Sequence, residues 1–453
     1  MFFNRKLKIF LSIILTLAVF SSTEAAFATY ETDAEVTSEA VYMVYMGENG
    51  DMPVYSKNEQ KKMYPASLTK IMTAIVLLEN EPDLSKTVTV DSSVFSDFYD
   101  ENGYYQYPST ADFQTGEVVE LNDLLYGMML QSACEAANII AYDVGKTKIS
   151  EFVEMMNETA KRIGAKNTHF TNPHGLFNSD QYTTAYDMYL ITKYAMSFEK
   201  FKEVATSPTY ELKATNIHPE PRTVTHTNYM MSKYLGGTEY YYPYASGIKT
   251  GTLDEAGRCL VSTASKDGYN YLIVSMGAPL TDENGEKYFY NFSDHIGLYE
   301  WAFKKFTLTK LVSANEDIME FPVGVSAGKD YVIADAETDY ITLLPYDFDM
   351  SQMTVELPEA KKINAPVEKG EVLGEMKISV DGEYITSVNL VASQQVKRST
   401  VKYILWICKE VLASKFMIAV YIILVILIIA YIILFNKTNK KKKKLRSRRQ
   451  ANK

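Results

Sequence analysis

The stretch Tyr64-Pro65-Ala66-Ser67-Leu68-Thr69-Lys70-Ile71-Met72-Thr73-Ala74 decides the fold prediction for this chain. We expect an apolar helix from about Ser67 to Leu78, which puts Ser67 and Lys70 one turn apart on one face. Backbone N–H groups at a helix start can stabilise an oxyanion. Apolar neighbours should desolvate Lys70 and lower its pKa, so that it can take the serine proton.

The Ser-x-x-Lys pattern alone does not establish a catalytic pair. An N-capping serine beside a surface lysine has the same spacing, and further matches begin at Ser197, Ser246, Ser326 and Ser399. The other motifs of the chain must therefore decide between the two interpretations.

A second motif, Ser132-Ala133-Cys134, falls within a run that predicts one helix from Leu121 to Val144, with Asn122 or Asp123 as N-cap. Ser132 would supply a second hydroxyl that relays a proton between Lys70 and a leaving group. Taken alone, the motif favours a small serine packed inside a helix, and only the other motifs favour the relay.

The third motif, Lys249-Thr250-Gly251, occurs once in the chain. On an edge strand that faces the serine, Lys249 and Thr250 would bind a substrate carboxylate, and Gly251 would permit close approach of the backbone. The backbone N–H of Thr252 would be a second oxyanion donor.

These motifs resemble those of the low-molecular-weight penicillin-binding proteins that act as D-alanyl-D-alanine carboxypeptidases. The resemblance extends from about Val41 to Ala302 and includes further segments: Asp123 to Leu130, Asn172-Pro173-His174-Gly175-Leu176, Thr183-Thr184-Ala185 and Gly247 to Gly251. A looser similarity, typified by Ala365-Pro366-Val367-Glu368-Lys369-Gly370, covers a later β-rich region.

The resemblance implies an α+β fold, with a β-lactamase/D,D-peptidase-like catalytic domain whose antiparallel sheet lies between helix layers. A small all-β domain and a C-terminal transmembrane helix would follow. The family usually has asparagine where this chain has Cys134, and that asparagine holds the lysine and the substrate amide. A thiol is a weaker hydrogen-bonding group, so turnover and substrate preference are open here.

The two ends of the chain predict export and membrane anchoring. Arg5, Lys6 and Lys8 precede an apolar run and the triplet Ala26-Phe27-Ala28, which is typical of a cleavable signal peptide, although an uncleaved anchor is the alternative. Phe416 to Phe435 is twenty uncharged residues, about 30 Å as a helix. The ten Lys/Arg of the tail predict a cytoplasmic C-terminus and an extracellular catalytic domain.

The expected organisation has six parts: signal peptide 1–28, catalytic domain 29–306, all-β domain 307–394, juxtamembrane segment 395–415, transmembrane helix 416–435 and basic tail 436–453. The whole chain has a formal net charge of −10, and the tail contributes +10, so the rest of the chain carries −20. This acidic charge argues against a nucleic-acid partner. The five histidines show no metal-ligand spacing, so we expect no metal and no cofactor. Cys134 and Cys259 would be either a disulfide or two small buried thiols.

The sequence therefore predicts a serine D-Ala-D-Ala carboxypeptidase that is acylated by penicillin and acts on peptidoglycan stem peptides. A serine β-lactamase is one alternative, but it needs a deacylating water, often held by a glutamate, and no Glu-x-x-Leu-Asn segment is evident. A catalytically weak wall-binding or scaffolding protein is the other alternative, and Cys134 is the feature that favours it.

Overall fold

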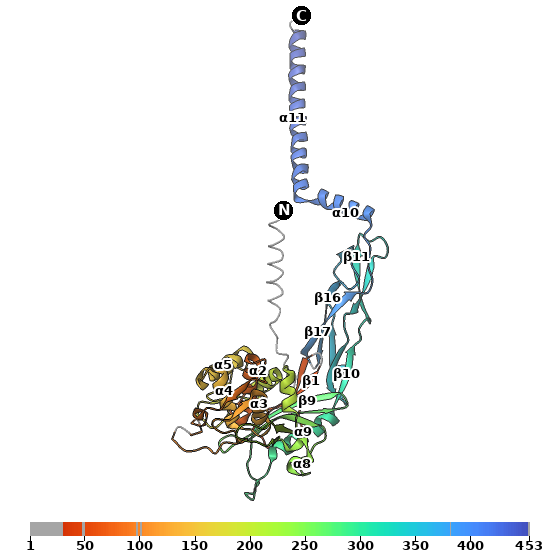
Figure 1. Ribbon diagram of the computed structural model, residues 1–453. Coiled ribbons are helices and arrows are strands. Elements are labelled where there is room, and N and C mark those ends of the chain that lie inside the picture. Colours follow the sequence, from red (N-terminus) through yellow and green to blue (C-terminus); the bar gives the residue numbers. More distant parts are fainter. Residues whose placement is uncertain (1–29, 48–49, 97, 100–101, 381, 452–453) are drawn as a thin grey trace. The chain divides into compact units, whose positions relative to one another are not determined.

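The computed structural model describes residues 30–47, 50–96, 98–99, 102–380 and 382–451 (Figure 1). The predicted signal peptide lies outside these residues. The chain forms two compact units. One holds the described residues up to Thr309 together with Leu343–Phe348, and the other holds Lys310–Thr342 and the described residues from Asp349 onward.

The first unit is built on a five-stranded antiparallel sheet with the strand order β2-β1-β9-β8-β7. Its strands are β1 (Ala40–Gly47), β2 (Gly50–Lys57), β7 (Ala245–Leu253), β8 (Gly257–Lys266) and β9 (Tyr269–Ala278). The hairpin β1-β2 pairs with β9, so sequence from both ends of the unit completes one sheet. Strand β7, which carries the Lys-Thr-Gly motif, is an edge strand as predicted.

Helices cover both faces of this sheet, and strand β9 shows why. Alternate side chains of a strand point to opposite faces. Leu272 and Val274 lie in one core with helix α6 (Ala185–Ala195), whereas Tyr271 and Ile273 lie in another with α9 (Tyr290–Lys305). The predicted α+β architecture, an antiparallel sheet between helix layers, is confirmed.

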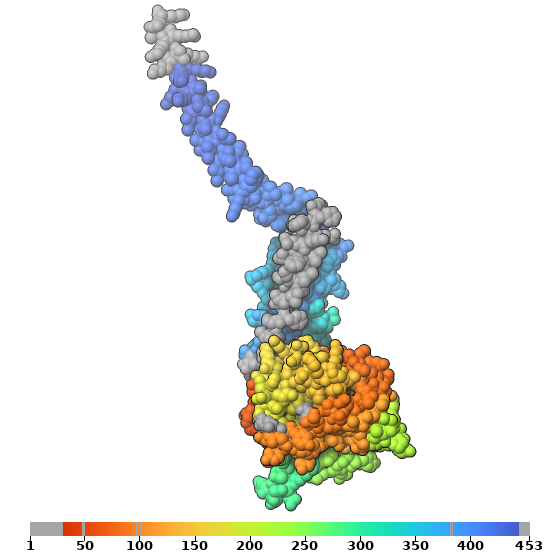
Figure 2. All heavy atoms as spheres, turned by 60° about the vertical axis from the view of Figure 1, so that its left-hand side comes forward, coloured from red at the N-terminus to blue at the C-terminus, as the bar shows by residue number. Residues whose placement is uncertain are grey.

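The layer on the α6 side is the larger one and contains the helices that carry the first two motifs. It comprises α2 (Thr69–Asn80), α3 (Leu121–Leu130), α4 (Cys134–Val144), α5 (Ile149–Arg162) and α7 (Glu199–Ala205). The short elements of the unit are β3 (Thr87–Thr89), β4 (Val118–Glu120), β5 (Thr209–Leu212), β6 (Arg222–Thr225) and α8 (Lys233–Gly236). In Figure 2 the orange and yellow atoms of the helical layer cover one face of the unit.

The prediction of one helix from Leu121 to Val144 is wrong. The helix is interrupted between α3 and α4, and Ser132 there adopts a left-handed backbone conformation with φ of +63°. The break is fixed from outside the segment, because the backbone N–H of Cys134 donates to the carbonyl of Ser109 at 2.8 Å. The predicted N-caps are also wrong: Glu120 is the N-cap, and the Asp123 carboxylate accepts hydrogen bonds from Tyr210 Oη and the Lys213 backbone.

The second unit contains a six-stranded sheet in the order β14-β16-β17-β12-β11-β15, which confirms an all-β domain. The strands are β11 (Asp317–Gly324), β12 (Tyr331–Ala336), β14 (Met353–Glu356), β15 (Ile363–Asn364), β16 (Val372–Val380) and β17 (Glu383–Ala392). Strands β10 (Phe306–Val312) and β13 (Tyr340–Pro345) pair as a separate two-stranded sheet. Helices α10 (Thr400–Ala413) and α11 (Lys415–Ala451) follow. Within α11, Lys415–Lys443 is long and apolar enough to cross a membrane.

Candidate active site

Ser67 lies in a tight turn that leads into helix α2. The turn is a short 3-10 helix, Ala66–Leu68, and Ala66 has a φ of +48°. The hydroxyl of Thr69 donates to the Ala66 carbonyl at 2.8 Å, a hydrogen bond that stabilises the turn. Ser67 is thereby held half-buried at the wall of a cavity, at the start of the helix that carries Lys70.

The Lys70 amine is fully buried beside the Ser67 hydroxyl. Its Nζ donates to Ser67 Oγ at 2.9 Å and to the carbonyl oxygen of His174 at 2.5 Å, and it lies 3.4 Å from Cys134 Sγ. Burial lowers the pKa of Lys70, and the neighbouring Cys134 and Glu135 oppose that shift. The contact with Ser67 and the lowered pKa are the two properties that a general base for serine requires.

The Asn172-Pro173-His174-Gly175-Leu176 loop presents the His174 carbonyl to Lys70. Asn172 Oδ1 accepts from the Gly175 backbone at 2.6 Å, and Asn172 Nδ2 donates to the Leu176 carbonyl at 3.1 Å. The hydroxyl of Thr73 on α2 donates to the Pro173 carbonyl at 2.5 Å. His174 thus contacts the Lys70 amine through its main chain, while its ring Nδ1 accepts a hydrogen bond from the Leu176 backbone.

The break between α3 and α4 directs Ser132 towards the third motif. Lys249 Nζ donates to Ser132 Oγ at 3.0 Å and to the Thr250 carbonyl at 3.0 Å. Both Ser132 and Lys249 are buried. Burial, aided by the charge of Lys70, lowers the pKa of Lys249 well below its ordinary value. Lys249 is therefore engaged inside the protein, while the Thr250 hydroxyl lies at the cavity, 2.5 Å from Thr227 Oγ1.

Cys134 is a buried thiol and not half of a disulfide. Both Cys134 and Cys259 are free. The Cys134 side chain packs with Phe98 and Leu176, and burial raises the pKa of its thiol. Lys70 therefore has a neutral sulfur beside it at the position where the family usually supplies an amide.

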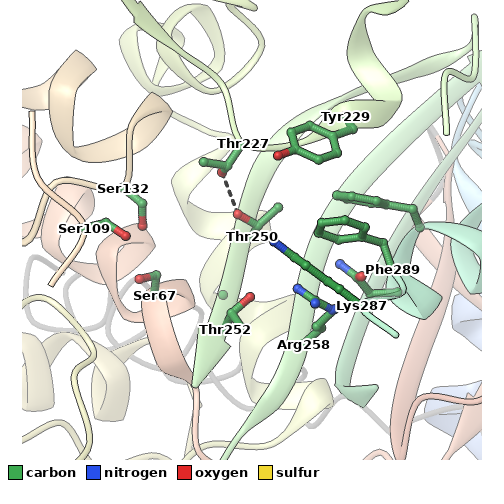
Figure 3. A pocket seen from close by; sticks show the side chains of 13 residues that line it. Ser67, Ser109, Ser132, Thr227, Tyr229, Thr250, Thr252, Arg258, Lys287 and Phe289 are labelled. Atoms are coloured by element: carbon green, nitrogen blue, oxygen red, sulfur yellow. Dashed lines mark hydrogen bonds between the residues drawn. The ribbon is translucent and has the colours of Figure 1, made fainter. Parts of the chain in front are cut away.

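The motifs meet at a cavity of about 250 Å³ (Figure 3). Ser67 and Ser132 lie on one wall, and Thr250, Gly251 and Thr252 of strand β7 form the opposite wall. A Cβ atom at position 251 would lie 3.1 Å from the backbone nitrogen of Ser67, so the strand approaches the Ser67 turn as closely as glycine allows.

Several residues of this cavity were missed by sequence reasoning. They are Ser109, Thr227, Tyr229, Arg258, Lys287, Phe289, Asn291 and Phe292. They come from loops, from strand β8, from a 3-10 helix at Tyr229 and from the start of helix α9, none of which carries a motif. Arg258 alone had a signal, since it follows the third motif on the adjacent strand. Among the described residues, no group of three or more His, Cys, Asp or Glu side chains is arranged to hold a metal ion.

Comparison with known proteins agrees with this architecture. The family model described as D-alanyl-D-alanine carboxypeptidase matches residues 28–280, and that of the penicillin-binding protein 5 C-terminal domain matches residues 306–398. The carboxypeptidase DacF of Bacillus subtilis is 26% identical over 391 residues, which cover 86% of this chain and 94% of DacF.

Two further relatives have solved structures. The D-alanyl-D-alanine carboxypeptidase of Streptomyces sp. K15 is 30% identical over 286 residues, 60% of this chain and 92% of that protein. A structure of the K15 DD-transpeptidase superposes with a TM-score of 0.51 at 28% identity, covering 60% of this chain and 99% of that one. Penicillin-binding protein 5 of Haemophilus influenzae, at 24% identity, shares the fold with a TM-score of 0.60 over 82% of this chain and all of its own.

The sheet, the Ser67–Lys70 contact and the Lys-Thr-Gly edge strand define a serine peptidase of the penicillin-binding class. Within that class, the chain belongs to the D-alanyl-D-alanine carboxypeptidase family, the S11 serine peptidases, and it is a D-Ala-D-Ala carboxypeptidase.

The close contact between Gly175 and the Ser67 turn gives a testable prediction. Gly175 has a φ of +84°, and a Cβ atom there would lie 1.9 Å from the Ala66 carbonyl oxygen. Gly285 has a φ of +81° with nothing within 4 Å of such an atom. Gly285→Ala should cost only the backbone strain, about 1–2 kcal/mol. Gly175→Ala should be more destabilising in thermal unfolding and should also slow acylation by penicillin.

Equal destabilisation by the two alanine variants, with unchanged acylation in both, would contradict this account of the turn.

Proposed function

We propose that Ser67 is the nucleophile, Lys70 its general base and Ser132 the proton relay of a carboxypeptidase that trims peptidoglycan stem pentapeptides. The observation that carries this proposal is the 2.9 Å hydrogen bond between Lys70 Nζ and Ser67 Oγ in a site where the amine is fully buried. A neutral amine in hydrogen-bond contact with a serine hydroxyl can accept its proton directly.

In the acylation step, Ser67 Oγ forms a bond to the carbonyl carbon between the two terminal D-alanines, and the hydroxyl proton passes to Lys70 Nζ. Backbone N–H groups of Ser67 and Thr252 would stabilise the oxyanion. The C–N bond then breaks, and the leaving amine of D-alanine takes a proton that Lys70 supplies through Ser132. Lys249, which donates to Ser132 Oγ at 3.0 Å, would orient this relay.

In the deacylation step, water attacks the ester carbonyl and Ser67 regains its proton. The residues that line the described cavity include no glutamate that would hold a deacylating water. This supports a peptidase with slow penicillin release over a β-lactamase.

The substrate carboxylate would be held at the far end of the cavity by Thr250, Gly251 and Arg258. We predicted Lys249 for this contact, but its amine is occupied by Ser132 and by the Thr250 carbonyl. Arg258 donates to the carbonyls of Tyr288 and Leu280 and forms no ion pair with a described residue. A buried guanidinium without an acidic partner favours a bound anion, and a peptide C-terminus supplies one.

Cys134 would act as a packing residue beside Lys70 and the substrate, in place of the family's asparagine. The K15 DD-transpeptidase has been solved as a serine-to-alanine and as a cysteine-to-asparagine variant two positions apart, so a Ser-x-Cys spacing also occurs in that enzyme. This supports an active enzyme over the scaffolding alternative.

We further propose that the protein is exported through segment 1–28 and anchored by residues 416–435, with the catalytic domain 29–306 outside the cell. The all-β domain 307–394 and the juxtamembrane segment 395–415 would act as a spacer. The apolar stretch in α11 and the basic tail 436–453 support this topology.

The nucleophile assignment predicts the outcome of labelling with a fluorescent penicillin. Full-length protein in detergent should become covalently labelled, and Ser67→Ala should lose the label completely because the hydroxyl that forms the acyl bond has been removed. Ser197→Ala, at one of the other Ser-x-x-Lys matches, is the control and should label normally. Undiminished labelling of Ser67→Ala would reject the assignment.

The carboxylate assignment predicts a substrate-dependent effect of Arg258→Gln. With a peptide ending in D-Ala-D-Ala, kcat/KM should fall about 10- to 100-fold, the effect of losing a charge-assisted hydrogen bond. With the same peptide as its C-terminal carboxamide, wild type and Arg258→Gln should be equally slow. Arg258→Lys should recover part of the loss.

An equal loss of activity on both peptides would mean that Arg258 only supports the local structure.

A further inference from the structure

Glu135 is a buried carboxyl group that the proposed mechanism does not use. Its side chain is 1% exposed at the start of helix α4, directly after Cys134. Oε1 accepts hydrogen bonds from the backbones of Ala111 at 2.6 Å and Phe113 at 3.4 Å. Oε2 has no hydrogen-bond partner among the described residues. A buried carboxyl oxygen without a donor is unusual and calls for an explanation.

Glu135 lies close to Lys70, because it directly follows Cys134, whose Sγ is 3.4 Å from Lys70 Nζ. Among the described residues, the amines of Lys70 and Lys249 contact only neutral acceptors, namely two hydroxyls, two carbonyls and the Cys134 thiol. Glu135 interacts electrostatically with both Lys70 and Cys134. It is the one carboxyl group that perturbs the titration of Lys70 among the described residues.

We propose, on the basis of the function proposed above, that Glu135 is a positioning residue that sets the protonation state of Lys70. It does so as the internal counter-charge of Lys70, while its hydrogen-bonded oxygen fixes the loop that carries Ser109. Loop and charge are linked, because the Cys134 backbone also donates to the Ser109 carbonyl at 2.8 Å.

The sign of the effect follows from the charges. Burial raises the pKa of Glu135 to about 7, so the group changes charge near neutral pH. When Glu135 is ionised it favours protonated Lys70, and when it is protonated it favours the neutral amine that accepts the Ser67 proton. Removing the carboxylate should therefore let Lys70 lose its proton at a lower pH.

The other titratable groups around the lysines do not reproduce this behaviour. Burial raises the pKa of the Cys134 thiol, so it stays neutral. Burial, together with Lys249, lowers the pKa of His226 to about 3, so this imidazole is also neutral. The two lysines disfavour each other's charge, and the charge of Lys70 lowers the pKa of Lys249, so this pair acts in the opposite direction to Glu135.

The test is the pH profile of penicillin acylation in full-length protein in detergent. Glu135→Gln keeps an acceptor oxygen for Ala111 and Phe113 but has no charge, whereas Glu135→Asp keeps the charge on a shorter side chain. In Glu135→Gln the midpoint of the rise in acylation rate should move about one pH unit lower, the size expected for loss of a nearby buried charge. Glu135→Asp should keep the wild-type midpoint, even if its absolute acylation rate differs from that of wild type.

The matched control is Glu158→Gln on the exposed face of α5, which should leave the profile unchanged. If Glu135→Gln lowers the rate equally at every pH with an unmoved midpoint, Glu135 only anchors the loop and the proposal is wrong. Failure of wild-type protein to acylate at Ser67 would instead overturn the proposed function.

A second measurement keeps the proposal testable if Glu135→Gln does not fold. The protonated carboxyl band of Glu135 can be titrated by infrared difference spectroscopy in wild type and in Lys70→Met. Loss of the neighbouring cation should raise the pH at which the band disappears. An unchanged titration would show that the two groups are not coupled and would reject the proposal.

Discussion

The exclusion of the Lys70 amine from water is the constraint on which the rest of the site depends. An ammonium group in such a position is costly, so the protein must either pair the charge or favour the neutral amine. Here the hydrogen-bond partners are a hydroxyl, a carbonyl and a thiol. They come from the Ser67 turn, the loop at His174 and helix α4, and each of these segments is held in place by contacts distant in the sequence.

Lys249 is a second buried lysine, and its protonation is coupled to that of Lys70. Lys249 lies on the edge strand that Gly251 allows to approach the Ser67 turn. A charge on Lys249 lowers the pKa of the Cys134 thiol beside Lys70 and is itself disfavoured by Lys70. Two further cationic side chains, Arg258 and Lys287, line the cavity itself. Such a site suits a substrate that ends in a carboxylate and a reaction that generates an oxyanion.

The motifs and the β-rich character of the later region could be predicted from the sequence, because motif spacing and turn residues are local. The antiparallel sheet between helix layers was implied only by the resemblance to the family, and the order of its strands was not predicted. The break at Ser132 was not predicted either, since an unbroken apolar pattern runs through it and the contact that fixes it lies at Ser109. The burial of Glu135 could not be predicted for the same reason. A charged residue in a helix is expected to be exposed, and only the three-dimensional structure shows the loop that covers this one. The proposed role of Arg258 could not be predicted either, because the carbonyls of Leu280 and Tyr288 that position its guanidinium are brought to it only by the fold.

The most direct test of the account is the protonation state of Lys70 in the free enzyme. Full-length protein with ¹³C-labelled lysine side chains, in detergent, would report it through the Cε resonance, assigned by comparison with Lys70→Arg. The account predicts a neutral amine for Lys70 at a pH well below the ordinary lysine range, while exposed lysines remain charged. A Lys70 resonance that titrates together with the exposed lysines would contradict it.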